Sequence, residues 1–395
     1  MSLQNPDFEL IGAAGSRYRV NTPALVLDLD AFDRNLNTMA RFCESAGVQL
    51  RPHAKTHKST KIAHRQIELG ARGICCATLD EAEVMSEAAL PGILITSPVV
   101  SAEKIERLMA LLRKSPDVMI VVDNATNVEI LDRAASRWGQ QLQVLVDFDL
   151  GHHRTGVLHI FDAIQLAQHV TAHAGLQFVG IQAYGGHLQH VADYSSRHKR
   201  ARKAEQSISQ LTKALTAAGL KPNIVTGAGT GTHLIDGTSG TFTELQAGSY
   251  IFMDAEYSDI EYKPSATWPF GIALFVQVAV ISTNVSGTVT TDGGTKAFAL
   301  NGPKPRIANE TFSGASYEFS GDEHGRIRLP DGVPSPQIAD RLECIVPHCD
   351  PTVAHYDVYY CVRGDILMDI WPIDARGRLV LRSETNGIVT TNHSR

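Results

Sequence analysis

The sequence lacks the features that mark membrane, secreted and nucleic-acid-binding proteins. No stretch approaches the roughly 18 consecutive apolar residues of a membrane-spanning helix, and residues 1–20 lack the pattern of a signal peptide. Lys and Arg number 36 against 42 Asp and Glu, so the net charge of −6 offers no basic surface for nucleic acid. We therefore expect a cytoplasmic protein whose partner is a small molecule, with no nucleic-acid or membrane partner.

Cysteine is also scarce, with six residues scattered along 395 positions. They are Cys43, Cys75, Cys76, Cys344, Cys349 and Cys361. Their spacing matches no disulfide framework, which indicates buried or free thiols in a reducing compartment. Low-complexity tracts and long Pro/Ser linkers are absent as well. The length gives a prior of two to three closely packed domains that need no disulfides for stability.

Short apolar runs alternate with helix-like patterns over the first two-thirds of the chain. The runs span residues 24–29, 48–52, 73–77, 92–96, 118–122, 142–147, 178–183 and 223–227. Eight strand–helix units predict an α/β fold with a parallel (β/α)8 barrel of the TIM type over residues 22–265. A doubly wound open sheet is the alternative, but no GxGxxG motif opens the first unit, which favours the barrel.

Beyond about Trp268 the pattern changes to alternating apolar and polar residues separated by turns. The runs at 273–282, 288–292, 326–330, 356–364 and 378–383 predict a C-terminal antiparallel β domain over residues 266–395. Residues 1–21 hold no barrel unit of their own. We expect this N-terminal segment to join the β domain, with residues 16–20 as an added strand.

A lysine follows the second predicted strand, in the sequence Arg51-Pro52-His53-Ala54-Lys55. The carboxyl ends of barrel strands form the mouth where barrel enzymes keep their chemistry. A lysine that is partly removed from water there can lose its proton and form a Schiff base, as pyridoxal 5′-phosphate requires. Taken alone, an ordinary surface lysine is the simpler interpretation of Lys55.

Two glycine-containing segments follow the last predicted barrel strand. Backbone N–H groups in such segments can converge on an anion, and barrel phosphate sites usually lie after strands seven and eight. The candidate phosphate-binding residues are Thr226, Gly227, Gly229, Thr230, Gly248, Ser249 and Tyr250.

These motifs together resemble the alanine-racemase-like (fold type III) pyridoxal phosphate enzymes, and specifically their D-threonine aldolase and D-serine dehydratase branch. The resemblance covers nearly the whole chain. It rests on TPALVLDLD, RPHAKTHK, LGARGICC, DFDLGHHRTGV, IQAYGGHLQH, TGAGTGT, ELQAGSYIFMDAEY, GDEHG and PHCDPTVAHYD. It implies that Lys55 carries the cofactor, that Arg154 faces the pyridine nitrogen and that Tyr184 lies beside the ring. It also implies that His190 is the catalytic base, a role that suits an imidazole because it titrates near neutral pH.

His348 and Asp350 are the candidate metal ligands. Two residues apart on an extended strand, they face the same side and can share one ion. The resemblance implies a divalent metal here, held in the dehydratases by a His-x-Cys pair. An aspartate in the third position favours Mn²⁺ or Mg²⁺ over Zn²⁺ and leaves Cys349 on the opposite face. Asp322 and Glu323 are weaker candidates for indirect contacts.

The resemblance implies retro-aldol cleavage of a D-3-hydroxy amino acid such as D-threonine into glycine and an aldehyde, by a carbon–carbon lyase that is a homodimer. Cleavage of 3-hydroxy-D-aspartate to glycine and glyoxylate is one alternative, and dehydration of D-serine or 3-hydroxyaspartate is another. A non-catalytic pyridoxal phosphate carrier and a racemase are further alternatives. The role of His187, where relatives have a small residue, stays open.

Overall fold

The computed structural model describes residues 6–377, which form two sheets. The strands of the first sheet are β2 (Gln49–Leu50), β3 (Cys75–Cys76), β4 (Leu94–Ile95), β5 (Met119–Val122), β6 (Leu142–Asp147), β7 (Leu176–Ala183), β8 (Ile224–Gly227) and β9 (Glu244–Leu245). They pair in parallel in the order β2-β9-β8-β7-β6-β5-β4-β3, and a parallel bridge between His53 and Cys75 brings the two edges together. The predicted parallel barrel domain is confirmed as this curled eight-stranded sheet.

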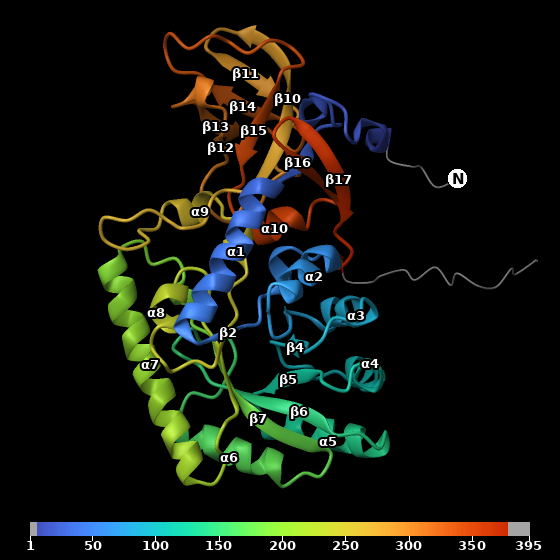
Figure 1. Ribbon diagram of the computed structural model, residues 1–395, viewed down its shortest axis with the longest axis vertical. Coiled ribbons are helices and arrows are strands. Elements are labelled where there is room, and N and C mark those ends of the chain that lie inside the picture. The colour runs from blue at the N-terminus through green and yellow to red at the C-terminus, as the bar shows by residue number, and fades with distance from the viewer. Residues whose placement is uncertain (1–5, 378–395) are drawn as a thin grey trace, which may run out of the picture.

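Helices follow the strands on the outside of the curled sheet (Figure 1). They are α1 (Leu29–Ala46), α2 (Thr60–Glu68), α3 (Leu79–Glu87), α4 (Ala102–Lys114), α5 (Ala125–Arg137), α6 (Ile160–Thr171), α7 (Tyr194–Ala217) and α8 (His233–Gly237). Local sequence explains where they begin. The hydroxyl of Thr78 accepts the N–H of Glu81 at the start of α3, and the hydroxyl of Ser101 accepts that of Lys104 at the start of α4. Among residues 6–377, no helix has both the length and the apolar character needed to cross a membrane.

The first predicted barrel strand belongs to the second sheet instead. β1 (Ala24–Asp28) pairs in parallel with β16 (Val358–Arg363) and antiparallel with β10 (Leu274–Val285). The prediction that residues 24–29 form a barrel strand is therefore wrong, although they do form a strand, and β9 is the eighth strand of the barrel. An apolar run that is buried on both faces fits the centre of either sheet, so the pattern could not distinguish them. Two residues of β9 are too few to show any period.

The second sheet is the β domain. Besides β1, β10 and β16 it contains β11 (Thr288–Thr291), β12 (Arg306–Ile307), β13 (Ser316–Phe319), β14 (Gly325–Arg328), β15 (Arg341–Ile345) and β17 (Ile366–Pro372). Apart from the β1–β16 pair, its neighbouring strands are antiparallel, so the predicted antiparallel β domain is confirmed. The strand predicted at 378–383 lies outside the described residues.

Residues 6–21 of the N-terminal segment pack on the β domain without adding a strand. These residues contain two 3-10 helices, η1 (Pro6–Leu10) and η2 (Ser16–Tyr18), so the strand predicted at 16–20 is wrong. The buried guanidinium of Arg17 donates two charge-assisted hydrogen bonds to Glu343 of β15, which anchor this turn on the β domain. The domain limits at 21 and 265 stay predictions.

The two domains meet over the loop that follows β2. The hydroxyl of Tyr359 in β16 donates to the carbonyl of His57, and the N–H of Ala375 donates to the carbonyl of Lys58. Two short helices, α9 (Ala255–Ser258) and α10 (Cys349–Val353), lie between the barrel and the β domain (Figure 1). The β domain therefore covers the region of the barrel mouth that carries Lys55.

Candidate active site

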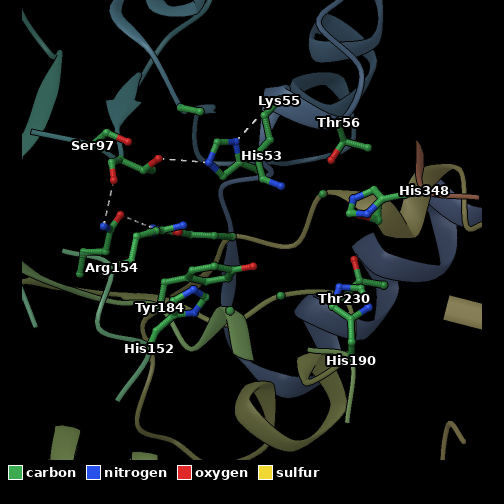
Figure 2. Close-up of a pocket in the computed structure, with 18 of the residues that line it drawn as sticks. His53, Lys55, Thr56, Ser97, His152, Arg154, Tyr184, His190, Thr230 and His348 are labelled. Atoms are coloured by element: carbon green, nitrogen blue, oxygen red, sulfur yellow. Dashed lines mark hydrogen bonds between the residues drawn. The ribbon is translucent and has the colours of Figure 1, made fainter. Parts of the chain in front are cut away.

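A cavity of about 240 Å³ lies where the carboxyl ends of the barrel strands face the β domain. Both domains contribute to its walls (Figure 2). The lining residues are His53, Lys55, Thr56, Ala77, Thr96, Ser97, His152, Arg154, Gln182, Tyr184, Gly186, His190, Gly229, Thr230, Gln246, Gly248, Ser249, Tyr257 and His348. The cavity thus gathers residues that are far apart in sequence at the barrel mouth.

Lys55 lies in η3 (Ala54–Thr56), a single 3-10 turn that follows β2. The ring of His53 accepts the backbone N–H of Lys55 at 3.4 Å, and its other nitrogen lies 3.1 Å from the hydroxyl of Thr96. The ammonium of Lys55 forms an ion pair with the carboxylate of Asp350. Burial alone would lower the pKa of Lys55, but the negative charge of Asp350 outweighs it and raises the pKa above its usual value.

His348 and Asp350 do not lie on an extended strand. His348 is the N-cap of α10 and Asp350 lies in its first turn, so the predicted geometry is wrong. Pro351 explains the difference, because a proline is well tolerated in the first turn of a helix, where its missing N–H costs no bond. The imidazole of His348 faces a glutamate and the carboxylate of Asp350 faces Lys55.

A divalent metal fits the chemistry of this pair, since imidazole nitrogen and carboxylate oxygen are both ligands of Mn²⁺. Burial would raise the pKa of Asp350, but the charges of Lys55 and His348 hold it below its usual range, so the carboxyl is ionised. No group of three or more His, Cys, Asp or Glu among residues 6–377 is arranged to hold a metal. Water or substrate would have to complete the coordination. Cys349 is fully buried, and its N–H donates to Asp254.

Four of the predicted phosphate-binding residues line the cavity: Gly229, Thr230, Gly248 and Ser249. Their backbone N–H groups donate no hydrogen bond to any residue in the described part of the chain. N–H groups without a protein acceptor at the wall of a cavity fit an anion such as a phosphate. This part of the cavity therefore fits the phosphate of pyridoxal phosphate.

Thr226, Gly227 and Tyr250 lie behind that lining. The hydroxyl of Thr226 accepts the side-chain amide of Gln246 at 3.1 Å. A Cβ on Gly227 would lie 2.0 Å from the carbonyl oxygen of Ala183, so glycine is needed there for strand packing. The N–H of Tyr250 donates to the hydroxyl of Thr230. We interpret these three residues as supports for the phosphate site, and direct contact with the cofactor stays a prediction.

Arg154 and Tyr184 lie together on the opposite side of the cavity from His190 and His348 (Figure 2). The guanidinium carbon of Arg154 lies 5.4 Å from the centre of the Tyr184 ring. Tyr184 immediately follows β7, and Arg154 lies in the loop after β6. The structure thus brings both predicted ring contacts to the same cavity as Lys55.

His190 follows η4 (Gly186–Leu188), and about a third of its side chain is exposed at 34%. Its ring centre lies 4.8 Å from that of Tyr257 and 6.1 Å from that of His348. Burial lowers the pKa of His190, which favours the neutral imidazole that a general base needs.

Several residues at the site were not predicted from the sequence. The amide of Gln182 donates to Asp147 and to the carbonyl of Thr96, while its oxygen accepts from Gln246. These residues tie four barrel strand ends together below the cavity. Gln182 and Gln246 lie inside the quoted motifs IQAYGG and ELQAGSY, so their place in a motif was the available sequence signal, and their burial appears only in the structure.

Three weaker candidates lie away from the cavity lining. The ring of His187 packs 5.5 Å from that of His152, which does line the cavity. Asp322 accepts a hydrogen bond from Thr295, and Glu323 forms an exposed ion pair with Lys296 in the β domain.

Comparison with known proteins identifies the family. A family model described as alanine racemase, N-terminal domain, matches residues 27–256. The chain belongs to this family. A second model, described as putative serine dehydratase domain, matches residues 273–362. Membership confirms the predicted alanine-racemase-like fold and implies pyridoxal 5′-phosphate as the cofactor.

The relatives of this family member include two aldolases that match almost end to end. D-threonine aldolase of Arthrobacter sp is 38% identical over 359 residues, covering 91% of this chain and 93% of the relative. 3-Hydroxy-D-aspartate aldolase of Paracoccus denitrificans (strain Pd 1222) is 34% identical over 363 residues, with coverages of 91% and 93%. The crystal structure of D-threonine aldolase from Filomicrobium marinum superposes with a TM-score of 0.87 at 39% identity, covering 91% of this chain and 96% of that one. The predicted branch and the predicted lyase class are confirmed by these matches.

Proposed function

We propose that this chain is an aldolase that uses pyridoxal phosphate and a divalent metal to cleave D-3-hydroxy amino acids of the D-threonine type into glycine and an aldehyde. One observation carries the proposal: Lys55, His190 and His348 line a single cavity, and Asp350 forms an ion pair with Lys55 there. Two relatives with aldolase names and near-complete coverage support it.

The cofactor would be held by residues at three sides of the cavity. Lys55 would bind its aldehyde, the free N–H groups of Gly229, Thr230, Gly248 and Ser249 would hold its phosphate, and Arg154 would face its pyridine nitrogen. When bound, pyridoxal phosphate supplies the electron withdrawal that stabilises negative charge on the substrate α-carbon. The permanently charged guanidinium of Arg154 at the ring nitrogen would keep that nitrogen unprotonated and so weaken the electron withdrawal. The weaker withdrawal is enough for an aldol cleavage.

His190 would move the proton that starts the cleavage. Its imidazole would accept the proton of the substrate β-hydroxyl, whose oxygen then forms the carbonyl of the aldehyde. The Cα–Cβ bond breaks, its electron pair stays on the α-carbon, and a proton returned to that carbon gives glycine. His348 and Asp350 would hold the metal, which supplies positive charge near the hydroxyl oxygen.

The other candidate reactions differ in product or in need for metal. A dehydratase would release ammonia and an oxo acid, and the aspartate at position 350 argues against the thiolate ligand expected for that branch. A non-catalytic carrier would need no β domain at the mouth of its barrel. Here the β domain contributes Asp350, whose carboxylate forms an ion pair with Lys55. The β-substituent of the substrate, a homodimeric assembly and a cytoplasmic location stay predictions.

Product analysis tests the proposal directly. The purified protein with pyridoxal phosphate, Mn²⁺ and D-threonine is expected to form glycine without ammonia, measured by separate quantification of the two. Ammonia without glycine would support the dehydratase. The absence of both products with D-threonine and with 3-hydroxy-D-aspartate would contradict the proposed function.

Replacing His190 by alanine is expected to lower turnover by about two to four orders of magnitude, the usual contribution of a general base. The absorbance of the bound cofactor should not change, because His190 lies across the cavity from Arg154 (Figure 2). His159→Ala is the matched control, since His159 is exposed and makes no capping hydrogen bond. A loss below tenfold in His190→Ala would assign the proton transfer to another group.

A further inference from the structure

The carboxylate of Glu256 lies between two of the histidines that line the cavity, His190 and His348. Its Oε1 is 3.3 Å from Nδ1 of His190 in the barrel, and its Oε2 is 3.0 Å from Nδ1 of His348 in the β domain. The two rings lie on the same side of the cavity (Figure 2). One side chain thus lies at ion-pair distance from the proposed base and a proposed metal ligand at the same time, and its Oε2 accepts no hydrogen bond in the described part of the chain.

The backbone fixes the position of Glu256. Its N–H donates to the carbonyl of Pro347, the residue directly before His348, at 3.2 Å. Asp254 caps α9 by accepting the N–H of Tyr257 and also accepts the N–H of Cys349 in α10, both at 2.9 Å. These bonds dock the first turn of α9 on the start of α10. The contact with His348 is therefore built into the fold rather than left to a mobile side chain.

Glu256 forms no ion pair with any other residue that the structure describes. Within residues 6–377, the basic groups at ion-pair distance from its carboxylate are the imidazoles of His190 and His348. About a quarter of its side chain is exposed, at 27%, so the contacts are partly shielded from water.

The consequence is chemical, because the two nitrogens of a neutral imidazole differ. The negative charge of a carboxylate favours the N–H on the ring nitrogen that faces it, which leaves the other nitrogen as the acceptor or metal ligand. We propose that Glu256 is a positioning residue that fixes the Nδ1–H form of both rings, so that Nε2 of His190 accepts the substrate proton and Nε2 of His348 binds the metal. The assignment of these two roles rests on the proposed function.

Glu256→Gln is the informative variant. An amide offers one acceptor and one donor, so it can satisfy the Nδ1–H of only one ring and opposes the other. Glu261→Gln is the matched control, because Glu261 lies on the same segment and its carboxylate accepts only the N–H of Tyr194 in the described contacts. Unchanged thermal midpoint and cofactor absorbance in both variants would establish that they fold.

Three readouts on the enzyme with bound pyridoxal phosphate test the two contacts separately. In Glu256→Gln, Mn²⁺ affinity, followed by loss of the free-Mn²⁺ electron paramagnetic resonance signal, is expected to fall about 10- to 100-fold. Turnover of D-threonine at saturating Mn²⁺ is expected to stay at least about tenfold low, because His190 is also misoriented. Glu261→Gln should match the wild type in both. Nitrogen-15 spectra of histidine-labelled wild type should show Nδ1–H for both rings, assigned with His190→Gln and His348→Gln.

Each outcome decides part of the inference. Full recovery of turnover at saturating Mn²⁺ would contradict the role at His190, and unchanged Mn²⁺ affinity would contradict the role at His348. Nε2–H forms of both rings in the wild-type spectrum would overturn the whole inference, whatever the two activity readouts give. If the wild type forms no glycine, the proposed function fails, while the spectrum still decides whether Glu256 sets the two rings.

Discussion

Replacing Lys55 by alanine is expected to leave a folded protein without covalently bound pyridoxal phosphate and without measurable turnover. The physical reason is that Lys55 is the lysine among the residues that line the cavity, so the variant has no amine there to bond to the cofactor. In the wild type the ammonium of Lys55 is paired with Asp350. Removing the amine that bonds covalently to the cofactor eliminates a whole step of the reaction. The loss of turnover should therefore exceed about three orders of magnitude. Absorbance of the purified protein in the visible range measures the cofactor.

Borohydride reduction of the wild type followed by peptide mapping provides a direct check. The modified lysine should be Lys55 and not its neighbour Lys58, whose ammonium is paired with Glu81. Lys61→Ala serves as the control, because the exposed Lys61 pairs with Asp369 on the β-domain surface. A stoichiometric, reducible cofactor in Lys55→Ala would contradict both the assignment and the mechanism built on it.

Lys55 could be predicted because its position follows from a general rule. Parallel strands end at the same edge of a sheet, so a residue just after β2 must reach the barrel mouth. The same rule placed Tyr184 after β7 and Gly229 after β8, and all three line one cavity. Sequence reasoning succeeded where the functional residue closely follows a strand that the sequence predicted.

The rule does not say which sheet a strand joins. β1 is apolar and buried whether it stands in a barrel or between β10 and β16, and only long-range pairing distinguishes the two. The eighth barrel strand, β9, was hidden because Glu244 is held in the sheet by a buried ion pair with Arg51, not by an apolar pattern. Buried charge pairs of this kind carry no periodic signal.

The proposed metal ligands and Glu256 show what could not be predicted at the site. His348 and Asp350 were identified from their types, but the assumption of an extended strand failed at Pro351 in α10. Glu256 was missed because its partners are His190 and His348, which come from separate parts of the chain. A three-residue contact across two domains exists only after folding, so spacing cannot reveal it.

Removal of the proposed metal is the second change with a large expected effect. Chelation of the wild type, or Asp350→Ala, should lower aldol cleavage by about two to four orders of magnitude, since a Lewis acid contributes several kcal/mol to such a step. The cofactor should remain bound, because Lys55 and the phosphate-site N–H groups are intact. Glycine formation before and after readdition of Mn²⁺ or Mg²⁺ measures the effect. Asp357→Asn is the control, since Asp357 is 77% exposed and pairs with Arg376.

A loss of activity in Asp350→Ala alone would be ambiguous, because the same carboxylate neutralises Lys55. Asp350→Cys separates the two effects. A thiolate at position 350 is a soft ligand that prefers Zn²⁺, so Zn²⁺ should restore cofactor-dependent turnover in this variant better than Mn²⁺ does. If the carboxylate served only to hold the charge of Lys55, metal identity would make no difference in the variant and chelation would make none in the wild type. Unchanged turnover of the thoroughly chelated wild type would therefore remove the metal from the proposed function and leave Asp350 as the charge partner of Lys55.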